Sequence, residues 1–334
     1  MSFELNNAQI RADMGQVDGE LRRVVSLPRY SKPIRVALDY LIKSPGKRLR
    51  PLLTVLSYRS IAGDVALPKS VIRLATAIEL IHMASLVHDD IIDAADTRHG
   101  QPSFHKQFGV EVAIPVGVLL YSISLKLLAD VGQIEVISRV SRAVDQLCGG
   151  ELDQVLSRNQ FDISVADYLL VLKKKTSALF SLSVWGGVLL AGAAPKKGQD
   201  AFHFGTSLGL LFQVSDDLLD VIGRSDQLLK EANQDFILGE ITLPMIVLLK
   251  RLSPQDRLKA LGIMESRDWD GLQWLVMQLS DSGVREECSE LMARYQARCE
   301  GYLGTLPRTE YSEILERVVG YISGRGVESD NSSR

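Results

Sequence analysis

The chain has 334 residues, of which 46% are hydrophobic and 24% are charged, with a net charge of −3 and a pI near 6.0. This is an ordinary globular balance, and it gives no indication of a nucleic-acid partner, because the basic residues are scattered rather than gathered in a stripe. Three cysteines (Cys148, Cys288 and Cys299) lack any CxxC or metal-finger spacing. An odd number of cysteines without a signal sequence predicts reduced thiols in the cytoplasm.

Nothing near the N-terminus has the apolar core of a secretory signal, since acidic residues appear early in segment 1–23. The stretch that comes nearest to a membrane span is Phe180–Pro195, which contains Ser, Trp and three glycines. It stops short of the 18 or more apolar residues that a spanning helix needs. We therefore expect a soluble protein with no transmembrane segment.

Helical periodicity dominates the chain, because apolar residues recur at three and four positions over most of its length. Strand patterns are sparse, and no break in the pattern is long or polar enough to be an interdomain linker. The sequence predicts an all-α protein with a single domain of ten or more helices over residues 1–323 and a polar C-terminal tail over 324–334. The clearest helical segments are Val71–Asp89, Ala113–Leu128, Ile134–Leu156, Ser164–Ala191 and Asp200–Val221.

The same acidic pattern occurs twice, as Asp89-Asp90-Ile91-Ile92-Asp93 and as Asp216-Asp217-Leu218-Leu219-Asp220. On a helix, the first and fifth positions lie on one face about 5–6 Å apart, so each motif presents a pair of carboxylates in one direction. A single copy is more often a solvated helix face. A solvated face alternates with Lys or Arg, however, and neither motif does. Two such pairs favour a site for Mg²⁺, which takes one or two carboxylates together with substrate phosphates.

Cationic residues near the motifs could hold the phosphates. Lys47, Arg48 and Arg50 open a helix after Gly46, where free backbone N–H groups and the helix dipole favour an anion. Taken alone, this block is more often a basic surface turn, but beside two metal-type motifs it favours a second diphosphate site. Further candidates, on the same grounds of position and chemistry, are Arg98, Lys175, Thr176, Gln213 and Lys230.

These blocks, in this order, resemble those of the trans-isoprenyl diphosphate synthases, the polyprenyl synthetase family. The matching blocks are GKRLRP, HDDxxD, RxGxP, the Lys-Thr pair, FQxxDDxxD and TLP, and they span residues 40–250. The resemblance is strongest to the long-chain synthases of heptaprenyl and octaprenyl type. It implies the isoprenoid synthase fold, a helical bundle around a deep central cavity, with about three Mg²⁺ ions held at the carboxylates. It also implies a homodimer, with a heteromer as the alternative.

The resemblance assigns roles by matching position. Isopentenyl diphosphate and an allylic diphosphate of farnesyl or geranyl type would be the substrates. The expected metal-binding residues are Asp89, Asp93, Asp216, Asp217 and Asp220. The expected catalytic residues are Asp89, Asp90, Asp93, Lys175 and Asp216. The expected substrate-binding residues are Lys47, Arg50, His82, Arg98, His99, Lys175, Thr176, Gln213 and Lys230.

His82 has an alternative explanation, because a lone histidine on an apolar helix face is usually a core residue. It lies seven residues before Asp89, two helical turns away on the same face, which together with the family match favours substrate binding.

Product length can be argued from Ala84 and Ser85, which precede Asp89 by five and four residues. At about 1.5 Å per residue they would lie about 6–7.5 Å deeper, near the first isoprene units, and their small size predicts an open tunnel and a product of about C30 or longer. A large aromatic residue there would cap a short product.

Three positions depart from the family pattern: His99 replaces an arginine, Glu240 replaces a diphosphate-binding lysine, and Val118 replaces an aspartate. They leave two alternatives open. The chain could be a non-catalytic or weakly active subunit of a heteromeric synthase, although both aspartate motifs are intact. It could also be a short-chain (C15–C20) synthase. A terpene cyclase is less favoured, because cyclases generally lack the GKRLRP block.

Overall fold

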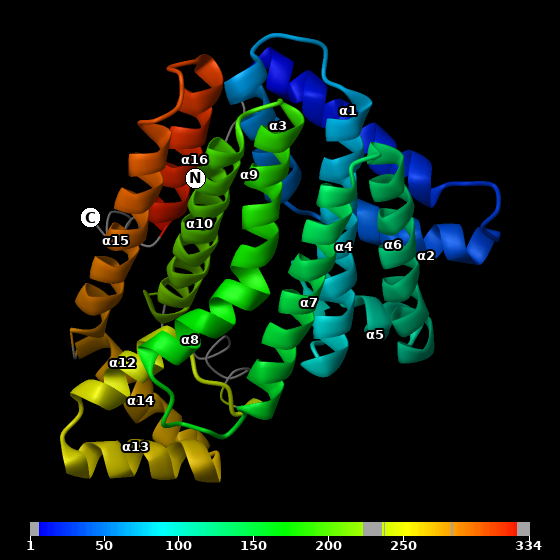
Figure 1. Cartoon of the computed structure of the whole chain (residues 1–334). Helices are drawn as coiled ribbons and strands as arrows, with labels where there is room; N and C mark the ends of the chain where they lie inside the picture. Colours follow the sequence, from blue (N-terminus) through cyan, green and yellow to red (C-terminus); the bar gives the residue numbers. More distant parts are fainter. Residues whose placement is uncertain (1–6, 223–235, 237, 282, 326–334) are drawn as a thin grey trace. The chain divides into compact units, whose positions relative to one another are not determined.

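The computed structural model describes residues 7–222, 236, 238–281 and 283–325. The described chain is built almost entirely of α-helices, as Figure 1 shows, which confirms the all-α prediction. Within this part the sheet consists of β1 (Thr97–Arg98) and β2 (Gln101–Pro102), which pair antiparallel. They form a small hairpin directly after the first aspartate-rich motif.

The chain divides into two compact units, and it enters each of them three times. Unit 1 comprises Met1–Val144, Leu179–Phe202 and Leu306–Ile314, and unit 2 comprises Asp145–Ala178, His203–Thr305 and Leu315–Arg334. The single domain expected over residues 1–323 stays a prediction.

Unit 1 contains α1 (Ala8–Val25), α2 (Lys32–Lys43), α3 (Leu49–Ala62), α4 (Lys69–Ile92), α5 (Phe104–Phe108), α6 (Val110–Val131) and α9 (Ala178–Leu190). Helix α4 packs against α1, α3 and α6, and it lies beside α6 in Figure 1. It is apolar on nearly every face, as expected for a helix that its neighbours enclose.

Two features fix the packing of unit 1. The buried Arg59 of α3 donates to both carboxylate oxygens of the buried Asp13 of α1, at 2.8 and 2.9 Å. A charge pair enclosed in this way is stable only with such bidentate geometry. On α9, a Cβ at Gly187 would lie 2.3 Å from the carbonyl oxygen of Thr54, so glycine is what lets α9 approach α3.

Unit 2 contains α8 (Val165–Leu172), the π-helical turn η1 (Lys173–Ser177), α12 (Leu243–Arg251), α13 (Pro254–Ser266), α14 (Trp269–Asp281) and α15 (Val284–Leu303), with most of α7 (Ile134–Leu156), α10 (Pro195–Ile222) and α16 (Glu310–Arg325).

Turn η1 carries the Lys-Thr pair and approaches two helices of unit 2 closely. A Cβ at Gly150 of α7 would lie 2.9 Å from the backbone nitrogen of Lys175, and a Cβ at Gly209 of α10 would lie 2.6 Å from Cα of Ser177. Two glycines therefore admit the widened turn between α7 and α10. Single π-helical turns of this kind occur often at functional sites.

Among the residues that the structure describes, two helices are long and apolar enough to cross a membrane by length and composition alone, namely α4 and α6. The stretch that the sequence analysis named as nearest to a span, Phe180–Pro195, covers most of the shorter helix α9. The most apolar window of α4 is 72% buried, as in a core helix, whereas that of α6 is 44% buried. Sequence inspection overlooked α4 and α6 because their apolar runs are interrupted by a few charged residues.

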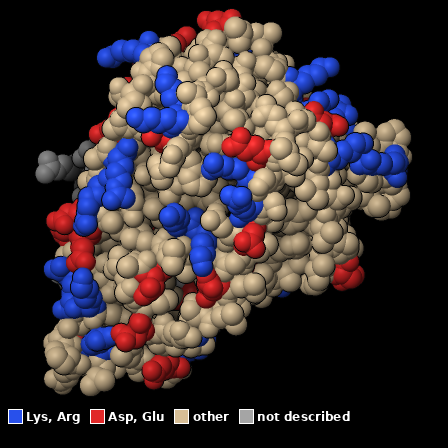
Figure 2. All heavy atoms as spheres, in the orientation of Figure 1, with Lys and Arg blue, Asp and Glu red and all other residues tan. Residues whose placement is uncertain are grey.

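The surface visible in Figure 2 carries Lys and Arg side chains interspersed with Asp and Glu.

Candidate active site

The first aspartate-rich motif ends helix α4 in unit 1. Asp89 and Asp90 lie in its last turn, and Asp93 is its C-cap, with its backbone N–H donating to the carbonyl of Asp89 at 2.8 Å. This turn contains no basic residue. Asp89 and Asp93 are half-buried, whereas Asp90 is only 3% exposed. The helix dipole disfavours carboxylates at this end, and a cation placed there stabilises them.

Asp90 has its cation within the protein. Nε and Nη2 of Arg98 both lie 2.8 Å from Oδ1 of Asp90. Arg98 belongs to β1, and the two residues of the hairpin turn, His99 and Gly100, both have positive φ. Such a turn needs residues that tolerate the left-handed region, which glycine and histidine do better than most. The RxG pattern therefore aims Arg98 back at α4.

Several basic side chains of unit 1 act electrostatically on His82. Enclosure by the protein lowers the pKa of His82 well below its ordinary value, and the charges of Arg50, Arg98, Arg48 and His99 lower it further, in that order. These groups therefore lie close enough to act on one another. Burial and the charge of Arg98 also lower the pKa of His99, while Asp90 opposes them.

The three cations of the GKRLRP block do different things. Arg48 donates to Glu79 of α4 at 2.8 Å and to the carbonyl of Ile42 at 2.7 Å, so it anchors the start of α3. The guanidinium of Arg50 lies 4.9 Å from the ring centre of Phe180. Lys47 is exposed. Of the two residues expected to set product length, Ala84 is fully buried and Ser85 is 6% exposed.

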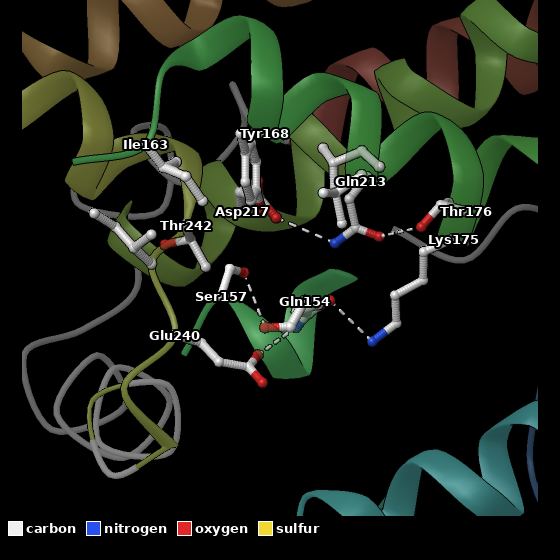
Figure 3. A pocket seen from close by; sticks show the side chains of 13 residues that line it. Gln154, Ser157, Ile163, Tyr168, Lys175, Thr176, Gln213, Asp217, Glu240 and Thr242 are labelled. Carbon is white, nitrogen blue, oxygen red and sulfur yellow. Dashed lines mark hydrogen bonds between the residues drawn. The ribbon is translucent and has the colours of Figure 1, made fainter. Parts of the chain in front are cut away.

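The second motif lies on α10 in unit 2, and Asp217 is its most enclosed described carboxylate, at 3% exposure. Tyr168 donates to Oδ2 of Asp217 at 2.8 Å, and Nε2 of Gln213 donates to Oδ1 at 3.1 Å. Thr176 in turn donates to the side-chain oxygen of Gln213 at 3.0 Å, which fixes the amide orientation (Figure 3). Burial raises the pKa of Asp217 to about 6, against the lowering effect of these donors.

The other second-motif candidates are less fully placed. Asp216 is half-buried on α10. Asp220 lies on the same helix, but its side chain and the whole of Lys230 fall outside the described residues. Val118, the third departure from the family pattern, is exposed on α6 in unit 1.

A pocket of about 190 Å³ opens beside Asp217, and Figure 3 shows its lining. Nζ of Lys175 lies 2.6 Å from Glu151 and 3.1 Å from the side-chain oxygen of Gln154. The amide of Gln154 also donates to Glu240. The lining residues are Gln154, Ser157, Ile163, Tyr168, Val171, Leu172, Lys175, Thr176, Gln213, Asp217, Glu240, Ile241 and Thr242.

Glu240, where the family pattern has a lysine, is paired within unit 2. Nε and Nη2 of Arg158 both contact Oε1 of Glu240, at 2.8 and 2.7 Å. Sequence analysis did not find Arg158, Gln154 or Glu151, because nothing in their spacing marks them. Tyr168 could have been found, since it precedes Lys175 by seven residues and so lies two helical turns away on the same face.

The side chains suit a hard divalent cation. Half-buried Asp89 and Asp93 offer oxygen ligands at a helix end that lacks a basic residue, which is the donor chemistry of Mg²⁺. Within the part of the chain that the structure describes, no group of three or more His, Cys, Asp or Glu side chains forms a ready metal cage. A cation would thus need oxygens from elsewhere, as Mg²⁺ commonly takes from substrate phosphates.

Helices α4 and α10, each bearing an aspartate-rich motif in an all-α chain, define a protein of the isoprenoid synthase class. The family model described as "Polyprenyl synthetase" matches residues 31–275. The chain therefore belongs to the polyprenyl synthetase family.

Individual relatives agree with this assignment. The chain is 32% identical to "Heptaprenyl diphosphate synthase component 2" of Geobacillus stearothermophilus, over 94% of this chain and 96% of the relative. It is 33% identical to the "Short chain isoprenyl diphosphate synthase" of Methanothermobacter thermautotrophicus, over 86% and 89%. The structure superposes on a decaprenyl diphosphate synthase from Rhodobacter capsulatus with a TM-score of 0.88 and 28% identity, covering 95% and 97%.

Proposed function

We propose that the chain is a Mg²⁺-dependent trans-prenyltransferase that condenses isopentenyl diphosphate with an allylic diphosphate, head to tail. The observation that carries the proposal is that both aspartate-rich motifs are complete. In each one the second aspartate is 3% exposed and held by donors of the protein itself. An acidic helix face without a function would not need such enclosed, oriented carboxylates.

The motifs divide their carboxylates between two tasks in this proposal. Asp89 and Asp93, and Asp216 with Asp220, are the metal ligands. Asp90 positions Arg98, and Asp217 orients the second motif through Tyr168 and Gln213, since both of its oxygens already accept hydrogen bonds. Bound Mg²⁺ would supply neutralisation of the negative charge that grows on the leaving diphosphate.

The cations add to that neutralisation. Arg98, Lys175 and Lys230 would contact the allylic diphosphate, and Thr176 and Gln213 would support that contact. Lys47, Arg50, His82 and His99 would bind isopentenyl diphosphate. The Lys175 ammonium is held by Glu151 and Gln154 before any substrate arrives. Such preorganised charge lowers the barrier to ionisation of the allylic substrate without further rearrangement.

Chemistry then follows from ionisation. The double bond of isopentenyl diphosphate attacks C1 of the allylic cation, forming the new carbon–carbon bond. Loss of a proton from the resulting tertiary cation, to the departed diphosphate, restores a double bond. The chain's residues hold and neutralise the diphosphates, and they exclude water from the cation.

We place the product at about C30 or longer, since Ala84 and Ser85 are small and buried on the helix that carries Asp89, about 6–7.5 Å below it. Names of the heptaprenyl and decaprenyl relatives support this length. The similarly close short-chain relative keeps a C15–C20 product as the second candidate.

A homodimer in the cytoplasm is the proposed working form. Helix α6 leaves the apolar residues Ile114, Val118 and Leu125 exposed, at spacings of four and seven that place them on one face. Because the first relative is named a component, a heteromer is the alternative. Light scattering of the purified chain distinguishes a dimer from a monomer that awaits another subunit.

The Glu240 departure does not argue against catalysis. Its carboxylate is paired with Arg158, so the pocket does not gain an uncompensated negative charge where the family has a lysine. We expect a diphosphate to bind in this pocket despite Glu240, because Arg158 neutralises its charge and Lys175 is a nearby cation.

The test is to incubate the purified chain with Mg²⁺, radiolabelled isopentenyl diphosphate and either farnesyl or geranyl diphosphate, and to size the dephosphorylated products. A ladder ending at one long prenol supports the whole proposal, and one ending at C15–C20 selects the short-chain alternative. No incorporation with any primer, by a chain that is folded by circular dichroism, would contradict catalysis and favour the subunit alternative.

A further inference from the structure

A second cavity, of about 600 Å³, lies within unit 1 between α1, α4 and α6. Its walls come from the second half of α1, the first turns of α4 and the last turns of α6. Lys69 begins α4, and Asp89 lies 20 residues further along the same helix. At about 1.5 Å per residue the cavity is thus about 30 Å along α4 from the first aspartate-rich motif. No residue of the proposed active site lines it.

Positive charge dominates the cavity lining. Two carboxylates, Glu20 and Asp130, face five cations, which gives a net charge of +3 (5 − 2). The cations are Arg23, Arg29, Lys69, Arg73 and Lys126. A concave wall concentrates the field of such an excess more than a flat surface does.

One of the two carboxylates, that of Glu20, is held by a neighbouring arginine. Arg23 binds both oxygens of Glu20, at 2.6 and 2.7 Å, and this hydrogen-bonded pair lowers the pKa of Glu20, with further lowering by the charges of Arg73 and Lys69. Nη1 of Arg73 donates to the backbone carbonyl of Asp130 at 2.9 Å, which fixes the start of α4 to the end of α6. Arg23 and Arg73 are therefore held in place, and the lining as a whole keeps a net charge of +3 that an anionic ligand can use.

The floor of the cavity is apolar. Val24, Ile123 and Leu127 are buried side chains that line it, and Leu27 and Ile72 are half-buried beside them. The combination suits a ligand with an anionic head and a hydrocarbon part, because arginine and lysine bind phosphate while the floor removes hydrocarbon from water.

We propose that this cavity, which we term the α1/α4/α6 site, binds a phosphate group that carries an apolar chain. The phosphate lies among Lys69, Arg73 and Lys126, and the chain lies on Leu27 and Ile72. Both a soluble alkyl or prenyl phosphate and the head of a phosphate-monoester lipid have this chemistry. The proposal does not depend on the activity proposed above.

The test uses the full chain, freed of metal by a chelating resin so that metal-dependent diphosphate binding does not contribute. Octyl phosphate is titrated into the protein by calorimetry, with inorganic phosphate as the headgroup-only probe. Lys69→Glu/Lys126→Glu removes the charge, and Lys69→Arg/Lys126→Arg retains it. The matched control, Lys196→Glu/Lys197→Glu, makes the same charge change at two exposed lysines of α10 that do not line the cavity.

We expect octyl phosphate to bind at least tenfold more weakly to the double glutamate variant, and to bind normally to the arginine variant and the control. Leu27→Asn should weaken octyl phosphate but not inorganic phosphate. The proposal would be overturned if Lys196→Glu/Lys197→Glu lost as much octyl phosphate affinity as the cavity variant. Equal octyl phosphate affinity in every variant would also overturn it.

Co-sedimentation with phosphatidylcholine vesicles, with and without phosphatidic acid, distinguishes a lipid head from a soluble alkyl or prenyl phosphate as the ligand. Binding that requires both phosphatidic acid and the two lysines identifies a lipid head. Binding of octyl phosphate without vesicle binding identifies a soluble phosphate. Binding of neither probe overturns the site.

Discussion

The two aspartate-rich motifs share one sequence pattern, yet the protein treats their second carboxylates differently. Asp90 of unit 1 is bound by the guanidinium of Arg98, whereas Asp217 of unit 2 is bound by two neutral donors, Tyr168 and Gln213. Both are 3% exposed. The first is an ion pair, whereas the second is a buried carboxylate that accepts from two neutral side chains, and burial raises its pKa to about 6. The same motif can thus support two electrostatic designs.

The largest effect on activity is expected at the first carboxylate of each motif, which both motifs are proposed to use as a metal ligand. Asp89→Asn and Asp216→Asn should each lower kcat by about 10²- to 10³-fold, since each removes a charged oxygen ligand from the transition-state charge balance. Steady-state kinetics at saturating Mg²⁺ measures this loss. If either variant kept nearly full activity, its motif would not hold the metal.

Removing the cation of the first motif should be the largest stability effect. Arg98→Gln leaves the buried Asp90 carboxylate without its charge partner, which should cost about 3 kcal/mol in the free energy of unfolding. Denaturant titration of metal-free protein measures this cost. In Asp90→Asn/Arg98→Gln no buried charge remains, so most of the loss should be recovered; a double variant as unstable as Arg98→Gln would contradict the ion-pair account.

Neutralising Asp217 of the second motif should instead raise the free energy of unfolding. Because the pKa of Asp217 in the folded protein, about 6, exceeds its ordinary value of 3.8, the folded state holds the proton more tightly. The stability that this provides is present below about pH 4 and is lost as the pH rises to about 6. Asp217→Asn should therefore be more stable than the parent above pH 6, by about 2–3 kcal/mol at most.

That difference should shrink towards zero below pH 4, and unfolding curves of metal-free protein from pH 4 to pH 8 give the profile. Asp90→Asn is the comparison, because it breaks an ion pair and should destabilise the protein at neutral pH. If both variants shifted stability in the same direction, the contrast between the two motifs would be wrong.

Tyr168→Phe tests the neutral donor of the second motif. Loss of the 2.8 Å hydrogen bond to Asp217 should lower kcat by about 10- to 100-fold, with a smaller effect on KM, as for other residues that orient metal ligands. Tyr295→Phe is the matched control, since it removes the hydroxyl of a buried tyrosine of unit 2 that does not line the pocket. Equal losses in the two variants would assign Tyr168 a structural role only.

The smallest effect is expected at His99, whose pKa is lowered, so that it is mostly neutral at neutral pH. His99→Arg places a permanent cation there and should lower the KM for isopentenyl diphosphate a few-fold at pH 8. As the pH falls through the pKa of His99, the parent gains its own charge and the ratio of the two KM values should approach one. Using the ratio cancels the titration of the substrate. An unchanged or raised KM at pH 8 would contradict the role.

The local sequence pattern was enough to predict the helices and to identify the aspartate-rich motifs. The apolar period of α4 predicted its extent to within a few residues, and the spacing of Asp89 with Asp93 identified the acidic helix end, because both depend on neighbours within two helical turns. The roles of the cations in the GKRLRP block were predicted less completely. The block marked three cations, but only the folded chain shows that Arg48 is used by Glu79, 31 residues away.

The sequence by itself determined that the chain is all-α, that it carries two complete aspartate-rich motifs, and which family it resembles. Tertiary structure decided what holds each second aspartate: a hairpin arginine eight residues from Asp90, and a tyrosine 49 residues from Asp217. It also decided that Arg158 pairs with Glu240 and that five cations of α1, α4, α6 and their flanks meet at one cavity. The physical reason is that helix periodicity is a short-range property, whereas desolvation and charge pairing depend on groups that only folding brings together.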